Sequence, residues 1–83
     1  MIYIAEYGNN RIQVFKHDGT FVKVIGKEGK GNGEFFLPWD VSIDVVRRRM
    51  IVADDGNKRV QFFNLDTFQY LSQFASGFSF GVV

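Results

Sequence analysis

The feature that most constrains this chain is an internal repeat. The segment AEYGNNRIQVF at residues 5–15 recurs as ADDGNKRVQFF at residues 53–63, an offset of 48 positions. Six of the eleven aligned residues are identical, and two more keep their chemical character (Glu6/Asp54 and Ile12/Val60). A repeat of roughly 20 to 50 residues is typical of solenoids and propellers, in which one unit cannot bury its own apolar face. We therefore expect a chain built from stacked units.

Each unit has the pattern of short β-strands. Residues 11–15 alternate polar and apolar side chains, which is the period of a half-buried strand. Asp18-Gly19 is typical of a hairpin turn, and no stretch combines helical periodicity with capping residues. We predict an all-β fold of β-propeller blades, each a four-stranded antiparallel meander, with about two blades per chain. The expected strands are residues 2–6, 11–15, 21–25, 41–45, 50–53, 60–64 and 68–74.

Composition narrows the chemistry. The 83 residues include no Cys and a single His, His17, which we expect in an exposed turn, and the formal net charge is +1. Disulfides and thiol chemistry are excluded, and neither a transition-metal site nor a strongly basic nucleic-acid arm is expected. The N-terminus does not resemble a signal peptide, and no apolar run approaches the roughly 20 residues of a membrane helix. We expect a cytoplasmic protein with no cofactor and no membrane partner.

The repeated residues resemble the NHL repeat. Residues 31–44 (GNGEFFLPWDVSID) are similar to the Gly-rich lead of that family, and residues 51–63 (IVADDGNKRVQFF) to its signature. Residues 5–15 supply a second copy, with Glu6 where Asp is usual. The resemblance covers residues 2–74 and implies a β-propeller, which in this family usually has six blades. The family includes the propellers of tripartite-motif proteins, some of which bind RNA hairpins, and amidating lyases with a metal in the central channel.

We expect residues 1–83 to form a single NHL-repeat unit. Residues 2–37 are assigned to a first repeat without its inner strand plus an inter-blade loop, 38–75 to a complete second blade, and 76–83 to a spare strand. Two blades do not close a ring, so we expect self-association, with three copies for six blades and a dimer or tetramer as alternatives. The spare strand of one copy is expected to pair with the first strand of the next, through Phe78, Phe80, Val82 and Val83 on one side and Ile2 and Ile4 on the other.

Two groups of residues are candidates for ligand binding; the alternatives are packing in the core or between blades for Trp39, and a solvated, edge-protecting hairpin tip for the arginines. By analogy with propellers, one ring end carries Tyr7, Trp39, Asp55 and Lys58, and the opposite rim carries Arg47, Arg48 and Arg49. Aromatic side chains beside cations are typical of single-stranded RNA recognition. We therefore expect a non-enzymatic binding or scaffold module that presents a ring face to protein or RNA. The alternatives are a fragment or engineered subset of a longer NHL propeller without independent function, and a catalytic propeller acting as a lyase or hydrolase.

Other polar and aromatic residues have structural interpretations. Asp54 and Glu6 share a repeat position and are expected to accept turn N–H groups or to pair with Arg59 and Arg11. The Gly-rich residues 26–33 lack the Lys-Ser/Thr of a phosphate-binding loop and are assigned to an inter-blade connection. Six aromatic side chains are expected in the core between the sheets: Phe15, Phe21, Phe62, Phe63, Phe68 and Phe74.

Overall fold

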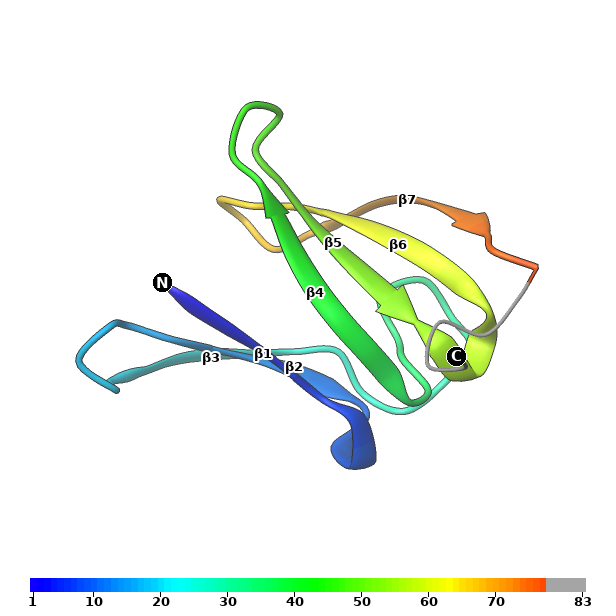
Figure 1. The fold of residues 1–83 in the computed structure, drawn as a ribbon, viewed down its shortest axis with the longest axis horizontal. Helices are drawn as coiled ribbons and strands as arrows, with labels where there is room; N and C mark the ends of the chain where they lie inside the picture. Colours follow the sequence, from blue (N-terminus) through cyan, green and yellow to red (C-terminus); the bar gives the residue numbers. More distant parts are fainter. Residues whose placement is uncertain (78–83) are drawn as a thin grey trace.

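The computed structural model describes residues 1–77, which form two antiparallel sheets (Figure 1). Blade 1 has three strands in the order β1-β2-β3, and blade 2 has four in the order β4-β5-β6-β7. The strands are β1 (Ile2–Glu6), β2 (Arg11–Phe15), β3 (Phe21–Ile25), β4 (Pro38–Asp44), β5 (Arg49–Asp54), β6 (Arg59–Asn64) and β7 (Tyr70–Ala75). Two 3₁₀ turns, η1 (Tyr7–Asn9) and η2 (Asp55–Asn57), follow β1 and β5. The predicted all-β blades are confirmed.

The offset of 48 residues is preserved in the backbone. Asn10 and Lys58 end the two 3₁₀ turns, and both have left-handed backbones, with φ of 55° and 52°. The ladders β1–β2 and β5–β6 match position for position, and a register shift falls after Val14 in blade 1 and after Phe62 in blade 2. A bulge bends a strand and strengthens its twist, so both blades twist at the same point.

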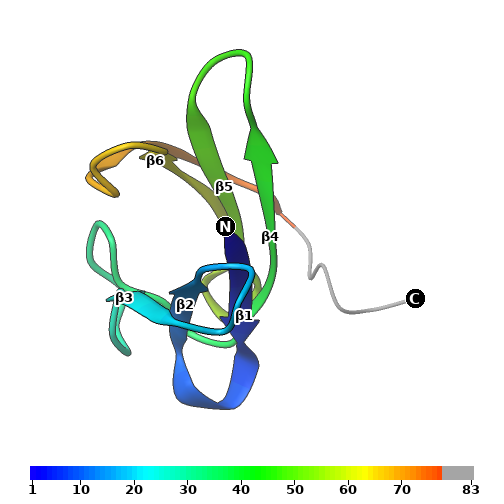
Figure 2. The same ribbon diagram turned by 90° about the vertical axis from the view of Figure 1, so that its left-hand side faces the viewer.

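The hydrophobic core lies between the two blades, which pack side by side (Figures 1 and 2). One face of blade 1, the inter-blade loop of residues 26–37 and one face of blade 2 all contribute to it. Burying each large side chain stabilises the fold by about 1.5–3 kcal/mol. The fully or almost fully buried members are Ile12, Val14, Ile25, Phe35, Met50, Val52, Phe63 and Leu65.

The aromatic residues depart from the expected core. Phe63 is buried, whereas Phe21 and Phe74 are exposed, so the prediction for those two is wrong. They lie on β3 and β7, the outermost strands of their sheets, where no further blade formed by residues 1–77 covers them, and each packs on a neighbour in its own blade. The ring centroids of Phe15 and Phe21, and those of Phe62 and Phe74, are 5.9 Å apart.

The first residues of two strands differ from the sequence prediction by more than one position. β4 begins at Pro38, three residues earlier than expected, and β7 begins at Tyr70, two residues later. Phe68 has a φ of 63° and donates its N–H to the carbonyl of Asn64 at 2.8 Å, so it closes a turn. No helix among residues 1–77 is long and apolar enough to cross a membrane.

Candidate functional site

Tyr7 and Trp39 meet at the end of the molecule where η1, η2 and the start of β4 gather, here called the loop end (lower part of Figure 1). Tyr7 is the first residue of η1, and Trp39 is the second residue of β4. The ring centroids are 5.9 Å apart in an edge-to-face arrangement, and the residues are 45% and 52% exposed. Each aromatic residue therefore keeps much of its surface open to solvent.

Asp55 and Lys58 lie at the same end, in the turn around η2. The Lys58 N–H donates to the Asp55 carbonyl at 3.0 Å, which closes the turn and leaves the exposed Lys58 side chain beyond it. The structure therefore places all four predicted residues at one end. Among them, direct ring contact joins Tyr7 to Trp39.

A pocket of about 370 Å³ adjoins this surface and was not anticipated from the sequence. Gly56 is the sequence feature that marks this pocket. A Cβ at this position would collide with the ring and the carbonyl of Phe36, so only glycine lets the inter-blade loop approach η2. The Gly56 N–H donates to that carbonyl at 2.7 Å. The pocket is lined by Glu28, Gly29, Lys30, Phe36, Gly56 and Asn57.

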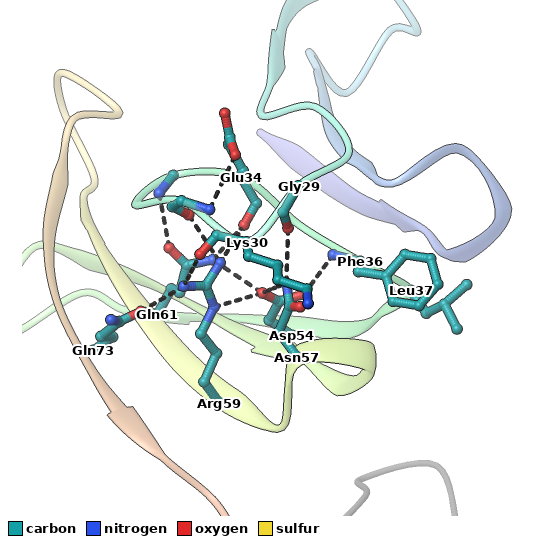
Figure 3. Close-up of polar contacts among 12 residues, drawn as sticks. Gly29, Lys30, Glu34, Phe36, Leu37, Asp54, Asn57, Arg59, Gln61 and Gln73 are labelled. Carbon is teal, nitrogen blue, oxygen red and sulfur yellow. Dashed lines mark hydrogen bonds and ion pairs between the residues drawn. The ribbon is translucent and has the colours of Figure 1, made fainter.

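A buried polar cluster fixes the inter-blade loop to blade 2 (Figure 3). The Arg59 guanidinium donates to Asp54 Oδ2 at 2.7 Å and to the amide oxygen of Gln73 at 2.8 Å. It also donates to three backbone carbonyls of the loop, at 2.8 to 3.0 Å. Arg59 thereby ties the loop to blade 2 through three carbonyls, which belong to Lys30, Gly31 and Glu34.

Asp54 completes this cluster from β5. Its carboxylate is fully buried and accepts from the Phe36 N–H at 2.8 Å, from Asn57 at 3.0 Å and from Gln61 at 3.2 Å, besides Arg59. The expected pairings of Asp54 with Arg59 and of Glu6 with Arg11 are confirmed. All acceptor positions of Asp54 serve the fold, which favours a structural role over a catalytic one.

Within residues 1–77, no group of three His, Cys, Asp or Glu side chains is arranged to hold a metal ion.

The three arginines of the β4–β5 hairpin lie at the opposite end, where each meets a carboxylate. Asp44 accepts from Arg47 and Arg49 at 3.3 Å, and Asp66 accepts from Arg48 at 2.6 Å. The backbone N–H of Arg47, followed by the arginine side chains, lowers the pKa of Asp44, and Arg48 lowers the pKa of Asp66. The guanidinium of Arg49 also stacks 4.7 Å from the Phe62 ring centre. The positive charge of this rim is largely compensated within the chain.

The residues expected to mediate self-association are only partly visible. Ile2 and Ile4 lie on β1, an edge strand of blade 1, and both are exposed. Phe78, Phe80, Val82 and Val83 lie outside the described residues.

Comparisons with known proteins agree with this architecture. The sequence model of a family described as a 6-bladed β-propeller matches residues 1–80. NHL repeat-containing protein 3 of Mus musculus is 37% identical over 71 residues, which is 86% of this chain and 20% of that protein. Protein lin-41 of Caenorhabditis elegans is 49% identical over 45 residues, 54% of this chain and 4% of that protein. The chain thus spans about a fifth or less of the length of these relatives.

A solved structure shows the same fold. It is a Bacteroides fragilis protein described as a candidate exported protein, with a TM-score of 0.81 and 28% identity. The match covers 93% of this chain and 22% of the solved one.

The expectation of a non-enzymatic protein is contradicted by a further relative. The peptidyl-glycine alpha-amidating monooxygenase of Mus musculus is 32% identical over 77 residues, 87% of this chain but 8% of the enzyme. The expectation rested on a missing catalytic set within 83 residues. Because the match covers so little of the enzyme, catalytic groups can lie elsewhere in such a protein, and repeats of this kind do not exclude an enzyme.

Proposed function

Because the chain belongs to the NHL-repeat family of six-bladed β-propellers, we propose that it contributes blades to a ring, completed by copies of itself, whose loop end binds single-stranded RNA. The observation that carries the proposal is the edge-to-face pair of Tyr7 and Trp39, two half-exposed aromatic residues at one end of the blades. Protein is the other partner class for such a surface, and the experiment below separates the two.

Exposed aromatic rings suit nucleobases. Stacking of a base on an aromatic side chain is worth about 1–3 kcal/mol and tolerates any sequence, because every base has a π-face. The loop end also carries an exposed cation, Lys58 after η2, and a second one, Lys30, lies on the wall of the adjoining pocket. No ion pair found among residues 1–77 involves either ammonium group, so both can meet phosphates.

The opposite rim is less suited to the same ligand. Arg47, Arg48 and Arg49 each pair with a carboxylate, Asp44 or Asp66, which offsets part of the positive charge that would attract a phosphate. The charge pairing therefore favours the loop end.

Fluorescence of Trp39 tests the proposal directly, because it is the only tryptophan in the chain. Titration with single-stranded RNA oligonucleotides should quench its emission saturably, since a stacked base contacts the indole. Tyr7→Ala should weaken binding by about 5- to 150-fold, the equivalent of one lost stack. Arg48→Ala, at the opposite end, is the matched control and should leave the affinity unchanged.

Three results would contradict the proposal. They are the absence of quenching at any RNA concentration, equal affinities of wild type and Tyr7→Ala, or a loss of affinity on removing Arg47, Arg48 and Arg49 together. The last would transfer the site to the hairpin rim. Quenching by a protein ligand but not by RNA would assign the surface to protein binding instead.

A further inference from the structure

The internal repeat allows each residue of blade 1 to be compared with its counterpart in blade 2. On one sheet face the two blades differ sharply. Met50 and Val52 of blade 2 are fully buried, whereas their counterparts Ile2 and Ile4 are 40% and 43% exposed. Every position on this face is less buried in blade 1. We call the blade 1 face the docking face; it comprises Ile2, Ile4, Glu6, Arg11, Gln13 and Phe15, counterparts of Met50, Val52, Asp54, Arg59, Gln61 and Phe63.

The structure shows what covers such a face in blade 2. The opposite face of blade 1 packs against it, through side chains of β1 and β2 that share the core with Met50, Val52 and Phe63. The residues of this covering face are Tyr3, Ala5, Ile12 and Val14. A docking face of this kind is therefore buried when the covering face of another blade packs against it.

The chain carries a second covering face, and no blade within residues 1–77 packs against it. Residues at the same repeat positions in blade 2 are Ile51, Ala53 and Phe62, which are half-buried, and Val60, which is buried. They lie on the side of blade 2 that faces away from blade 1, and Ile51, Ala53 and Val60 border a shallow hollow of about 200 Å³. The hollow is lined by Asp40, Ser42, Ile51, Ala53 and Val60. Both halves of the interface that the molecule already forms internally are thus present again on opposite sides, each without a partner blade among the described residues.

The polar residues of the docking face also make fewer hydrogen bonds than their counterparts in blade 2. In blade 2 the Arg59 side chain is 9% exposed and donates to three loop carbonyls. Its counterpart Arg11 is 39% exposed, and the carboxylate of Glu6 is its one partner found within residues 1–77. A guanidinium carries five N–H donors, so Arg11 retains donors for backbone carbonyls brought by another blade.

We propose that the docking face of blade 1 binds the open covering face of blade 2 of a second copy, head to tail. This inference rests on the proposed function, in which copies of the chain form a ring, and it identifies the surfaces through which the copies make contact. A heterologous contact of this kind closes when the rotation per copy divides a full turn, and otherwise extends as a filament. With two blades per chain and six per ring, three copies close it.

The mass of the complete 83-residue chain in solution tests the proposal, measured without RNA by light scattering during size exclusion. Wild type should form a species of three chains of 9.5 kDa, about 28 kDa. Ile4→Glu places a charge on the docking face and should reduce the mass to that of one chain. Because Ile4 is exposed in the single chain, the variant should keep its β-sheet circular dichroism. Val46→Glu, on the exposed hairpin tip, is the matched control and should leave the assembly intact.

A mixing experiment separates head-to-tail docking from other self-association. Ala53→Glu blocks the covering face and should also yield single chains. Mixed in equal amounts, Ile4→Glu and Ala53→Glu retain one intact pair of faces, so they should form a complex of two chains, about 19 kDa, that grows no further. A monomeric wild type, an assembly insensitive to Ile4→Glu, or a mixture without the two-chain complex would overturn the proposal. If the chain stayed monomeric but bound RNA, the proposed RNA site would be retained and the proposed self-association would be rejected.

Discussion

Replacing Arg59 by methionine should destabilise the fold far more than the same change at Arg11. The two positions are repeat counterparts, so their sequence context is similar. They differ in how deeply the arginine is buried. Arg59→Met keeps the length of the side chain but removes five hydrogen bonds from a cluster in which Asp54 is fully buried. Removing one partner of a buried ion pair costs about 3–5 kcal/mol, because the remaining charge stays desolvated.

That cost is large for a chain of this size. At roughly 0.05–0.15 kcal/mol per residue, the free energy of unfolding of 83 residues is about 4–12 kcal/mol. Arg59→Met should therefore remove about a quarter of the stability or more, or abolish folding. Arg11→Met should produce a change too small to resolve, because the pair of Arg11 and Glu6 is partly solvated and screened.

Urea unfolding measures the difference, followed by circular dichroism and by Trp39 fluorescence. At a slope of roughly 1 kcal/mol per molar urea, the midpoint for Arg59→Met should fall by about 3 M or disappear. The chain must be kept dilute enough to be monomeric, since docking of a second copy would bury Arg11. Equal midpoint shifts in the two variants would refute the argument that burial of the cluster, and not the presence of the pair, sets its contribution.

Two further predictions concern other repeat and surface positions. Gly56→Ala should destabilise the fold by about 1–3 kcal/mol, because its Cβ would overlap Phe36; Gly8→Ala, whose Cβ meets nothing within 4 Å, should be neutral in the same thermal unfolding assay. Arg48 lowers the pKa of Asp66, so their pairing stabilises the fold above the ordinary Asp pKa and ceases to do so as pH falls through the lowered value. Asp66→Asn should therefore be less stable than wild type at neutral pH and match it in strong acid; a constant difference would contradict this assignment.

The repeated strands could be predicted from sequence because their information is local. Alternation in residues 11–15 and 60–64 specifies a half-buried strand wherever it lies. The charged pairs Glu6–Arg11 and Asp54–Arg59 were also accessible, since each spans one turn. The sequence predicts Lys58 as a candidate ligand-binding residue but does not indicate its left-handed backbone, because Lys seldom adopts that conformation.

Contacts between segments that are distant in the chain could not be predicted from the sequence in the same way. The inter-blade loop supplies the carbonyls for Arg59 from 25 to 29 residues away, and nothing in a Gly-rich sequence specifies where its carbonyls point. The arginine tip depends on distant residues in a similar way. Three adjacent cations suggest a positive rim, but Asp66, 18 residues beyond Arg48, folds back to neutralise one of them. Phe21 and Phe74 are exposed because strand order, and not hydrophobicity, decides which strand is outermost.

The hydrogen bonds from Arg59 to the loop before its own blade affect how blades can be exchanged between such proteins. The carbonyls that Arg59 binds precede β4, so a crossover between the loop and β4 would separate the arginine from its acceptors. A crossover at Gly26, just after β3, would keep Arg59 and its acceptors together, but the loop would still meet Asn10 of the preceding blade, which donates to Glu28 and accepts from the Leu37 N–H. Chimeric propellers spliced at the first kind of joint should therefore need changes in the loop, whereas those spliced at the second should need an asparagine at the position of Asn10 in the preceding blade.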